Sequence, residues 1–223
     1  MKKILTFCLL AAIIGISTNI KAQESMTQEE KISYALGASN GEYFKQQGID
    51  VNADAFMKGF KDGLAGTNQF TQAEMEQIFA EFQQMMQKKQ NSMTEVEKEK
   101  GKAFLAENKK KEGVVETASG LQYKVVKMGT GAKPSATDRV KVHYHGTLLD
   151  GTVFDSSVER GEPITFGLNQ VIAGWTEGVQ LMPIGSKFIF YIPSNLAYGD
   201  RAAGSIKPGS TLIFEVELLD IEK

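Results

Sequence analysis

Cysteine and histidine are scarce in this chain, and their scarcity excludes much covalent chemistry. The 223 residues include one cysteine, Cys8, and two histidines, His143 and His145. Without Cys8, which lies in the apolar N-terminal run, the chain can form no disulfide and no thiolate metal site. The histidines flank Tyr144, and strand alternation would turn both away from the face that Tyr144 uses. We expect no hydrolytic site and no bound metal, with a His-x-His metal pair as the less favoured alternative.

Long apolar runs are scarce too, and the one that exists begins near the N-terminus. Lys2 and Lys3 precede an apolar run from Ile4 to Ile16, and the chain then turns polar before Ala22. A basic start, a short apolar centre and a small residue before the cut are typical of a secretory signal. We therefore predict a signal peptide over residues 1–22 and export across the inner membrane, to the periplasm or in association with the outer membrane. An uncleaved membrane anchor is the alternative.

The chain also lacks a strong charge of either sign. Its formal charge is −2, and removal of the signal with its three lysines leaves 22 basic residues against 27 acidic ones, or −5. A mildly acidic protein does not suit a polyanionic partner, so we expect no nucleic acid to bind. The 42% of hydrophobic residues and 23% of charged ones are typical of a soluble globular protein.

Residues 23–70 carry the pattern of short helices. Thr27 and Glu30 have the spacing of a capping box, and Asn52 can cap a second helix that ends near Gly66. Two short helices bury their apolar faces poorly as a lone hairpin. Gly37 and Gly41 also leave a smooth surface where another backbone can approach. We therefore predict that residues 23–70 form a helical dimerisation segment.

Residues 71–112 are predicted to form one long connecting helix. Thr71 and Glu74 repeat the capping pattern, and the stretch 87–102 is almost entirely polar and contains no proline. A helix of this length would extend roughly 60 Å, and its polar part is predicted to be a solvated spacer. A disordered charged linker is the alternative. Gly101 marks a weak point, because glycine costs about 1 kcal/mol inside a helix.

After Gly113 the hydrophobic pattern changes to period two. Four segments alternate or run apolar, at 121–126, 140–144, 187–192 and 211–218, and glycine-containing turns separate them. One short helix is predicted from about Gly174 to Leu181, ended by Pro183. Residues 113–223 are therefore predicted to be an α+β domain, in which an antiparallel sheet wraps around a single helix.

Five motifs in the last third combine aromatic and apolar residues with one isolated acid, Asp155. They are Val-His-Tyr-His-Gly (142–146), Asp-Gly-Thr-Val-Phe-Asp-Ser-Ser (150–157), Val-Ile-Ala-Gly-Trp-Thr-Glu-Gly-Val (171–179), Leu-Ala-Tyr-Gly (196–199) and Thr-Leu-Ile-Phe-Glu-Val-Glu-Leu-Leu (211–219). An aromatic wall with few charges suits a small, rigid, apolar ligand such as a proline side chain. In order and spacing, residues 113–223 resemble the FKBP-type peptidyl-prolyl cis-trans isomerases. The helical N-terminal layout is similar to the macrophage infectivity potentiator group of that family, which dimerises through this part.

The resemblance implies a role for each matching residue. Trp175 would be the floor under the proline ring, and the Ile172 backbone N–H and the Tyr198 hydroxyl would each hold a substrate carbonyl. Asp155 would accept a hydrogen bond from Tyr144 or polarise the twisting amide, although it could equally be a turn residue. Asp155 and Tyr198 are the catalytic candidates, and the substrate-binding candidates are Tyr144, Phe154, Phe166, Val171, Ile172, Trp175, Ile206 and Phe214. The alternative for each aromatic residue is an ordinary core position.

The function implied is non-covalent isomerisation of prolyl bonds in exported polypeptides, without a cofactor. The implied partners are proline-containing unfolded chains, macrolide inhibitors and a second copy of the chain. Two segments that look shorter than in minimal family members, 166–171 and 199–208, leave the affinity for macrolides open. The rival hypothesis is a holdase chaperone that binds unfolded exported chains and isomerises them incidentally.

Overall fold

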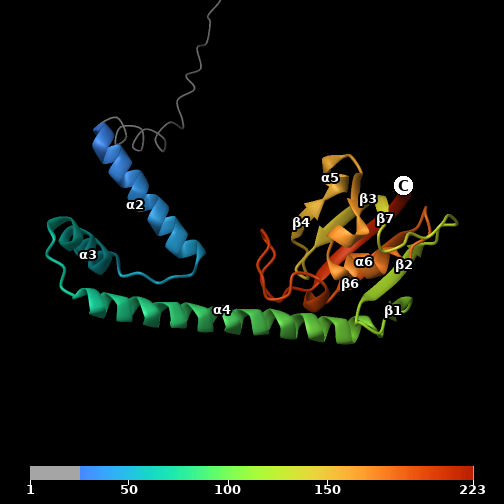
Figure 1. The fold of residues 1–223 in the computed structure, drawn as a ribbon, viewed down its shortest axis with the longest axis horizontal. Coiled ribbons are helices and arrows are strands. Elements are labelled where there is room, and N and C mark those ends of the chain that lie inside the picture. Colours follow the sequence, from blue (N-terminus) through green and yellow to red (C-terminus); the bar gives the residue numbers. More distant parts are fainter. Residues whose placement is uncertain (1–25, 223) are drawn as a thin grey trace, which may run out of the picture. The chain divides into compact units, whose positions relative to one another are not determined.

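The structure, a computed structural model, describes residues 26–222 (Figure 1). Its contacts divide the chain into one unit that ends at Met75 and a second that runs from Glu76 to Lys223. The predicted signal peptide, residues 1–22, lies outside the described residues. Within the described part, no helix combines the length and the apolar character that a membrane crossing requires.

The first unit contains two helices that begin at the predicted caps. Helix α2 (Gln28–Gln46) follows Thr27, whose backbone N–H donates to Glu30 Oε2 at 2.7 Å while its hydroxyl accepts from the Glu30 N–H at 3.2 Å. Helix α3 (Ala53–Ala65) is capped by Asn52, whose Oδ1 accepts from the Ala55 N–H at 2.9 Å. It ends at Gly66, which has a left-handed backbone (φ 69°). These local signals confirm the predicted helix boundaries.

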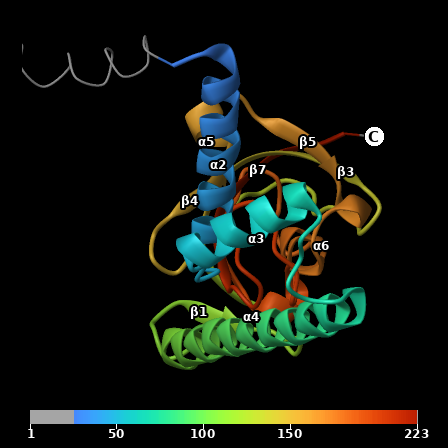
Figure 2. The same ribbon diagram turned by 90° about the vertical axis from the view of Figure 1, so that its left-hand side faces the viewer.

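Neither α2 nor α3 buries a residue against the described chain. The two helices are inclined to each other instead of running parallel (Figure 2), and near their connecting loop the rings of Phe44 and Phe56 are 5.6 Å apart. Apolar side chains along both helices are more than two-fifths exposed, namely Ile32, Leu36, Tyr43, Phe56, Phe60 and Leu64. The first unit therefore presents uncovered apolar faces.

Helix α4 (Gln72–Asn108) is continuous over 37 residues. It starts at Thr71, whose backbone N–H donates to Glu74 Oε2 at 2.8 Å. It passes through Gly101 without a break and ends four residues before the predicted boundary at 112. Ion pairs three residues apart, such as Glu95 with Lys98 (3.0 Å), line its exposed surface. The predicted long helix is thus present, and the alternative of a disordered linker does not describe this segment.

The second half of α4 packs against the C-terminal sheet, which differs from the predicted solvated spacer. Its buried residues are Thr94, Gly101 and Asn108, which recur every seven positions and so share one stripe of the helix. Asn108 Nδ2 donates to Gln122 Oε1 at 3.0 Å, and Gln122 Nε2 donates to the Leu105 carbonyl at 2.9 Å. Gly101 lies so close to Thr211 that a Cβ there would collide with the threonine hydroxyl. The stripe is small and polar, so an apolar pattern could not have revealed it.

The second unit is built on an antiparallel sheet of seven described strands. The strand order along the main path is β1-β2-β6-β7-β3-β4, and β5 pairs with the other part of β3. The bounds are β1 (Val114–Glu116), β2 (Gln122–Lys127), β3 (Arg139–Thr147), β4 (Val153–Ser156), β5 (Ile164–Gly167), β6 (Lys187–Ile192) and β7 (Leu212–Glu222). A short helix, α5 (Ser157–Arg160), follows β4, and one-turn 3₁₀ helices occupy Leu168–Gln170 and Ser194–Leu196.

The sheet curves around helix α6 (Ala173–Val179), as Figure 1 shows. The helix lies close to the sheet because Gly178 has no side chain, and a Cβ there would come within 2.6 Å of the Phe190 ring. Strand residues alternate between buried and partly exposed, and the core between sheet and helix includes Val142, Phe188, Phe190, Val216 and Leu218. The predicted α+β domain, with one short helix inside an antiparallel sheet, is confirmed.

Candidate active site in an aromatic pocket

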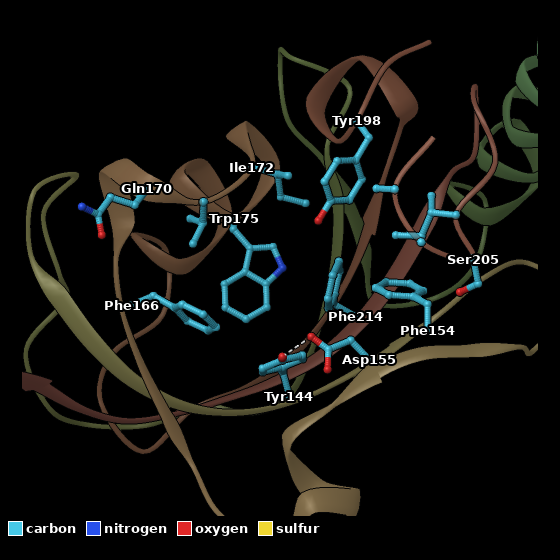
Figure 3. Close-up of a pocket in the computed structure, with 14 residues that line it drawn as sticks. Tyr144, Phe154, Asp155, Phe166, Gln170, Ile172, Trp175, Tyr198, Ser205 and Phe214 are labelled. Atoms are coloured by element: carbon cyan, nitrogen blue, oxygen red, sulfur yellow. Dashed lines mark hydrogen bonds between the residues drawn. The ribbon is translucent and has the colours of Figure 1, made fainter. Parts of the chain in front are cut away.

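A cavity of about 530 Å³ opens between α6, the strands that curve around it and the segment before β7 (Figure 3). All ten residues singled out from the sequence line it, namely Tyr144, Phe154, Asp155, Phe166, Val171, Ile172, Trp175, Tyr198, Ile206 and Phe214. The lining also includes Gln170, Ala203, Gly204 and Ser205, for which the sequence motifs predicted no part. The structure thus gathers the candidates in one place, while their roles toward a substrate stay predictions.

Trp175, on helix α6, forms the floor of this pocket. Its side chain is only 4% exposed, and three rings meet it almost at right angles. The ring centroids of Tyr144, Phe166 and Phe214 lie 5.4, 5.7 and 5.2 Å from the indole. Edge-to-face pairs of this kind each contribute about 0.5–1.5 kcal/mol beyond the burial of their area. The indole N–H has no oxygen or nitrogen partner among residues 26–222. The ring is therefore fixed by packing against the three aromatic rings and by no hydrogen bond of its own among the described residues.

The walls come from four strands, each of which supplies one ring. Tyr144 stands on β3, Phe154 on β4, Phe166 on β5 and Phe214 on β7. The rings of Phe154 and Phe214 meet edge to face at 5.3 Å over Gly146, which pairs with Phe214 across the sheet. A Cβ on Gly146 would lie 2.7 Å from the Phe154 ring and 2.9 Å from the Phe214 ring. Gly146 thus makes room for this corner of the wall.

One side of the pocket is polar, and three residues share it. The Tyr144 hydroxyl donates to Asp155 Oδ2, as the sequence analysis predicted (Figure 3). Arg160 Nη1 donates to Asp155 Oδ1, and Arg160 Nη2 donates to the Tyr144 hydroxyl oxygen at 2.9 Å. Arg160 lies at the end of α5, five residues after Asp155, and the sequence analysis missed it. A basic residue one short helical turn beyond the acid was the only signal that could have indicated it.

The hydrogen bonds of this cluster fix its protonation. Burial raises the pKa of the Asp155 carboxyl, but hydrogen bonds from Tyr144 and Arg160, with the charge of Arg160, outweigh burial and lower that pKa below its ordinary value. Burial and the neighbouring Asp155 raise the pKa of the Tyr144 hydroxyl. At neutral pH the site therefore holds an ionised carboxylate beside a neutral phenol. This arrangement can hold charge and position hydrogen bonds, but Asp155 is poorly suited to donate a proton.

The opposite side of the pocket is formed by the segment before β7 and by the start of α6. Tyr198 is 40% exposed, and Figure 3 shows its hydroxyl directed toward the centre of the hollow. Ile206, one of the substrate-binding candidates, is 4% exposed and lines the cavity, and its carbonyl accepts from the Ala203 N–H at 3.0 Å. Ile172 is the N-cap residue of α6, so its backbone lies at the pocket edge.

The two histidines do not line the pocket, as their strand positions predicted. His143 Nδ1 lies 3.2 Å from the Ser157 hydroxyl, and His145 Nδ1 lies 3.0 Å from the Ser156 hydroxyl. Across the part of the chain that the structure describes, no three His, Cys, Asp or Glu side chains are grouped to hold a metal ion.

Two family models match this chain, and together they span most of it. Residues 29–125 match the domain amino terminal to FKBP-type peptidyl-prolyl isomerase, and residues 130–219 match the FKBP-type peptidyl-prolyl cis-trans isomerase domain. The chain therefore belongs to the FKBP-type peptidyl-prolyl cis-trans isomerases, and it is similar to members of that family over nearly all of its length.

Three relatives illustrate this similarity. The FKBP-type isomerase FkpA of Aeromonas hydrophila is 53% identical over 90% of this chain and 79% of its own. The outer membrane protein MIP of Legionella longbeachae is 46% identical over 96% of both chains. The crystal structure of FkpA from Escherichia coli superposes with a TM-score of 0.69 at 38% identity, covering 88% of this chain and 97% of that one.

The predicted family and activity are therefore confirmed. The protein is a peptidyl-prolyl cis-trans isomerase, and proline-containing polypeptides are its substrates. The apolar hollow over Trp175 is of a size and character that suits a proline ring.

Proposed function

We propose that the isomerisation takes place in the pocket over Trp175, with Asp155 and Tyr198 as the catalytic residues. The observation that carries this proposal is the meeting of all ten candidate residues around one cavity, in a domain whose family isomerises prolyl bonds. In this arrangement the proline ring rests on the indole, and Tyr144, Phe154, Phe166, Val171, Ile206 and Phe214 enclose it. The Ile172 N–H and the Tyr198 hydroxyl face the carbonyl oxygens on either side of the ring.

The chemistry needs no nucleophile, because no covalent bond is broken. Partial double-bond character gives the peptide bond a rotational barrier of about 18–20 kcal/mol, and uncatalysed prolyl isomerisation takes tens to hundreds of seconds. The twisted transition state has lost the charge separation of the planar amide. An apolar pocket shaped for the twisted form therefore binds the transition state more tightly than the ground state, which accelerates rotation. The Asp155 carboxylate, held by Tyr144 and Arg160, supplies a fixed negative charge at the edge of the pocket.

Turnover of a proline tetrapeptide by the full chain tests this assignment. Trp175→Ala and Asp155→Ala are expected to reduce kcat/KM at least tenfold, which corresponds to about 1.4 kcal/mol of transition-state stabilisation. Trp175→Phe is measured beside Trp175→Ala. It keeps an aromatic ring at the pocket floor, so the fold should lose less packing energy than in Trp175→Ala. Asp220→Ala, at an exposed acid on β7, is the matched control and should turn over like the parent. An inactive parent chain, or variants as active as Asp220→Ala, would reject the proposed site.

We also propose that the protein is a homodimer assembled through residues 23–70. The uncovered faces of α2 and α3 support this, since neither helix buries a residue within its own chain. Contiguous exposed apolar surface of this kind is typical of interaction sites. The open surfaces at Gly37 and Gly41, where no atom lies within 4 Å of an added Cβ, allow close approach of a second backbone.

The proposed location is the periplasm, where exported unfolded chains would be the clients. The relative named an outer membrane protein supports the cell envelope in general, and the basic, apolar start of the sequence supports export. The matched relatives are named as isomerases, so the holdase hypothesis is not favoured. Macrolide inhibitors are proposed as competitive ligands of the same pocket, and competition with the tetrapeptide would test this.

A further inference from the structure

One wall of the pocket is a segment without regular structure for most of its length. Residues 197–211, which we call the roof segment, connect the 3₁₀ helix Ser194–Leu196 to β7. The segment brings Tyr198, Ala203, Gly204, Ser205 and Ile206 to the cavity. Its own bonds close it at the base, where the Gly209 N–H donates to the Gly199 carbonyl at 2.8 Å. The position of Tyr198 therefore depends on how this base is held.

Helix α4 contacts the roof segment at three levels, although it precedes the isomerase domain in the sequence. Lys98 Nζ pairs with Asp200 Oδ1 at 2.8 Å, two residues from Tyr198. The backbone of Thr94 lies against Gly209, where an added Cβ would come within 2.6 Å of the Thr94 carbonyl oxygen. Gly101 lies against Thr211 at the end of the segment. In Figure 1 the segment before β7 lies directly over this half of α4.

Lys98 is the residue that joins these contacts. The place of a Cβ on Gly209 is 3.1 Å from Lys98 Cγ, so its stem covers the base of the segment while its ammonium group reaches Asp200. Glu95, one turn earlier on α4, lies 3.0 Å from the same ammonium group and orients it. Hydrogen bonds that Lys98 donates to these two acids, first Asp200 and then Glu95, raise the pKa of its ammonium group. Lys98 is thus charged at neutral pH.

We propose that Lys98 is a positioning residue of the isomerase, through which α4 holds the roof segment and so places Tyr198 over the substrate. The proposal rests on the proposed function of the pocket, in which the Tyr198 hydroxyl is a catalytic group that holds a substrate carbonyl in the ground state and the transition state alike. Lys98 lines no part of the cavity and acts through Asp200 and Gly209.

The test uses the full chain and changes each partner of the ion pair separately. Lys98→Met keeps the stem that covers Gly209 and removes the charge, and Asp200→Asn removes the other charge. Each is expected to raise the KM for a proline tetrapeptide about two- to fivefold, the range that exposed ion pairs provide, with kcat unchanged. The KM of the double variant should be no higher than that of either single variant, because the two changes remove the same interaction. Lys98→Arg should restore the parental KM.

Lys102→Met is the matched control. Lys102 lies one turn further along α4 and pairs with Glu99 at 3.4 Å instead of with an acid of the roof segment, and both side chains are more than two-thirds exposed. Peptide binding is also measured by the fluorescence of Trp175, the single tryptophan of the chain, which lies at the pocket floor. Weaker binding by this readout should match the rise in KM.

Three results would overturn the positioning role of Lys98. They are an unchanged KM in Lys98→Met, effects of the single variants on KM that add in the double variant, and a rise in KM in Lys102→Met equal to that in Lys98→Met. Failure of the proposed function looks different, because the parent chain itself would then show no turnover. In that case the fluorescence titration would still report whether Lys98 controls peptide binding to the pocket.

Discussion

At the scale of single residues, the aromatic pocket could be predicted and its support could not. Ten of the fourteen lining residues could be named from sequence motifs and a family resemblance, because the chemistry of the pocket lies in their own side chains. Arg160 was missed because an arginine on a four-residue helix reads as an ordinary surface charge. Gly146 stood inside a motif, but its part in the pocket is visible only when the rings of Phe154 and Phe214 are placed beside it.

Arg160 should set the pH below which the protein begins to lose stability. The folded-state pKa of Asp155 lies below its ordinary value, so its contribution to stability is present above about pH 4 and is lost as the pH falls through the lower folded pKa. Arg160→Met removes a hydrogen bond to Asp155 and a positive charge, both of which lower this pKa, while burial continues to raise it. The pKa of Asp155 should therefore rise, and stability should begin to fall at a higher pH than in the parent.

Urea unfolding between pH 3 and pH 7 measures this shift, and a carboxyl NMR titration assigns it to Asp155. The effect should be modest, because the Asp155 side chain is 45% exposed and solvent screens its charge. Arg139→Met, at an exposed arginine on β3, is the control and should titrate like the parent. If stability falls at the same pH in Arg160→Met and Arg139→Met, the role assigned to Arg160 is wrong.

At the scale of elements, predictions succeeded where the signal is local. The capping residues Thr27, Asn52 and Thr71 each mark a helix start, because a cap acts through the next three residues alone. Period-two segments gave the main strands. The docking of α4 was missed because its buried stripe, Thr94, Gly101 and Asn108, is small and polar. Such a stripe matters only through partners far along the chain, here Thr211 and Gln122.

Gly101 is expected to be required for that docking. Gly101→Ala should gain about 1 kcal/mol of helix propensity, but its methyl group would collide with Thr211, and overpacking costs about 1–3 kcal/mol. The variant should therefore be less stable in urea unfolding, or at best equal to the parent. Gly59→Ala in α3 meets no atom of its own chain within 4 Å and should show no such loss. A Gly101→Ala protein clearly more stable than the parent would mean that α4 does not pack as described.

At the scale of the whole molecule, the isomerase core and the proposed dimerisation segment lie in separate units. The buried apolar residues run from Leu121 to Leu218, and none lies in α2 or α3. A chain of residues 76–223 should therefore fold, turn over a proline tetrapeptide at a rate within about twofold of the full protein, and sediment as a monomer. The full protein without residues 1–22 should sediment as a dimer, and a monomeric full protein would reject the proposed assembly.

The start of that shorter chain matters. The sequence predicted a boundary at Gly113, but a chain beginning there would lose Asn108 and expose Gln122, which is fully buried in the structure. It would also lose the contacts that Thr94 and Lys98 of α4 make with the roof segment. We expect the chain from residue 113 to be less stable than the chain from residue 76, as measured by thermal unfolding.

The smooth surface of α2 gives a second test of assembly. In a monomer, Gly37→Leu should not lower the stability of α2. No atom lies within 4 Å of the new Cβ, and leucine favours helix more than glycine does. In a dimer with close backbone approach at Gly37, the same change should weaken association at least tenfold in dilution sedimentation. Ser33→Leu, one turn earlier on α2, controls for added apolar surface.

The absence of one side chain on β3 has a wider consequence. Gly146 is not part of the cavity lining, yet two of the rings in the pocket wall can approach each other only because nothing projects from it. A methyl group there would push Phe154 and Phe214 apart and change the width of the pocket. The fit of a client's proline ring thus depends on a backbone position that lies outside the pocket lining.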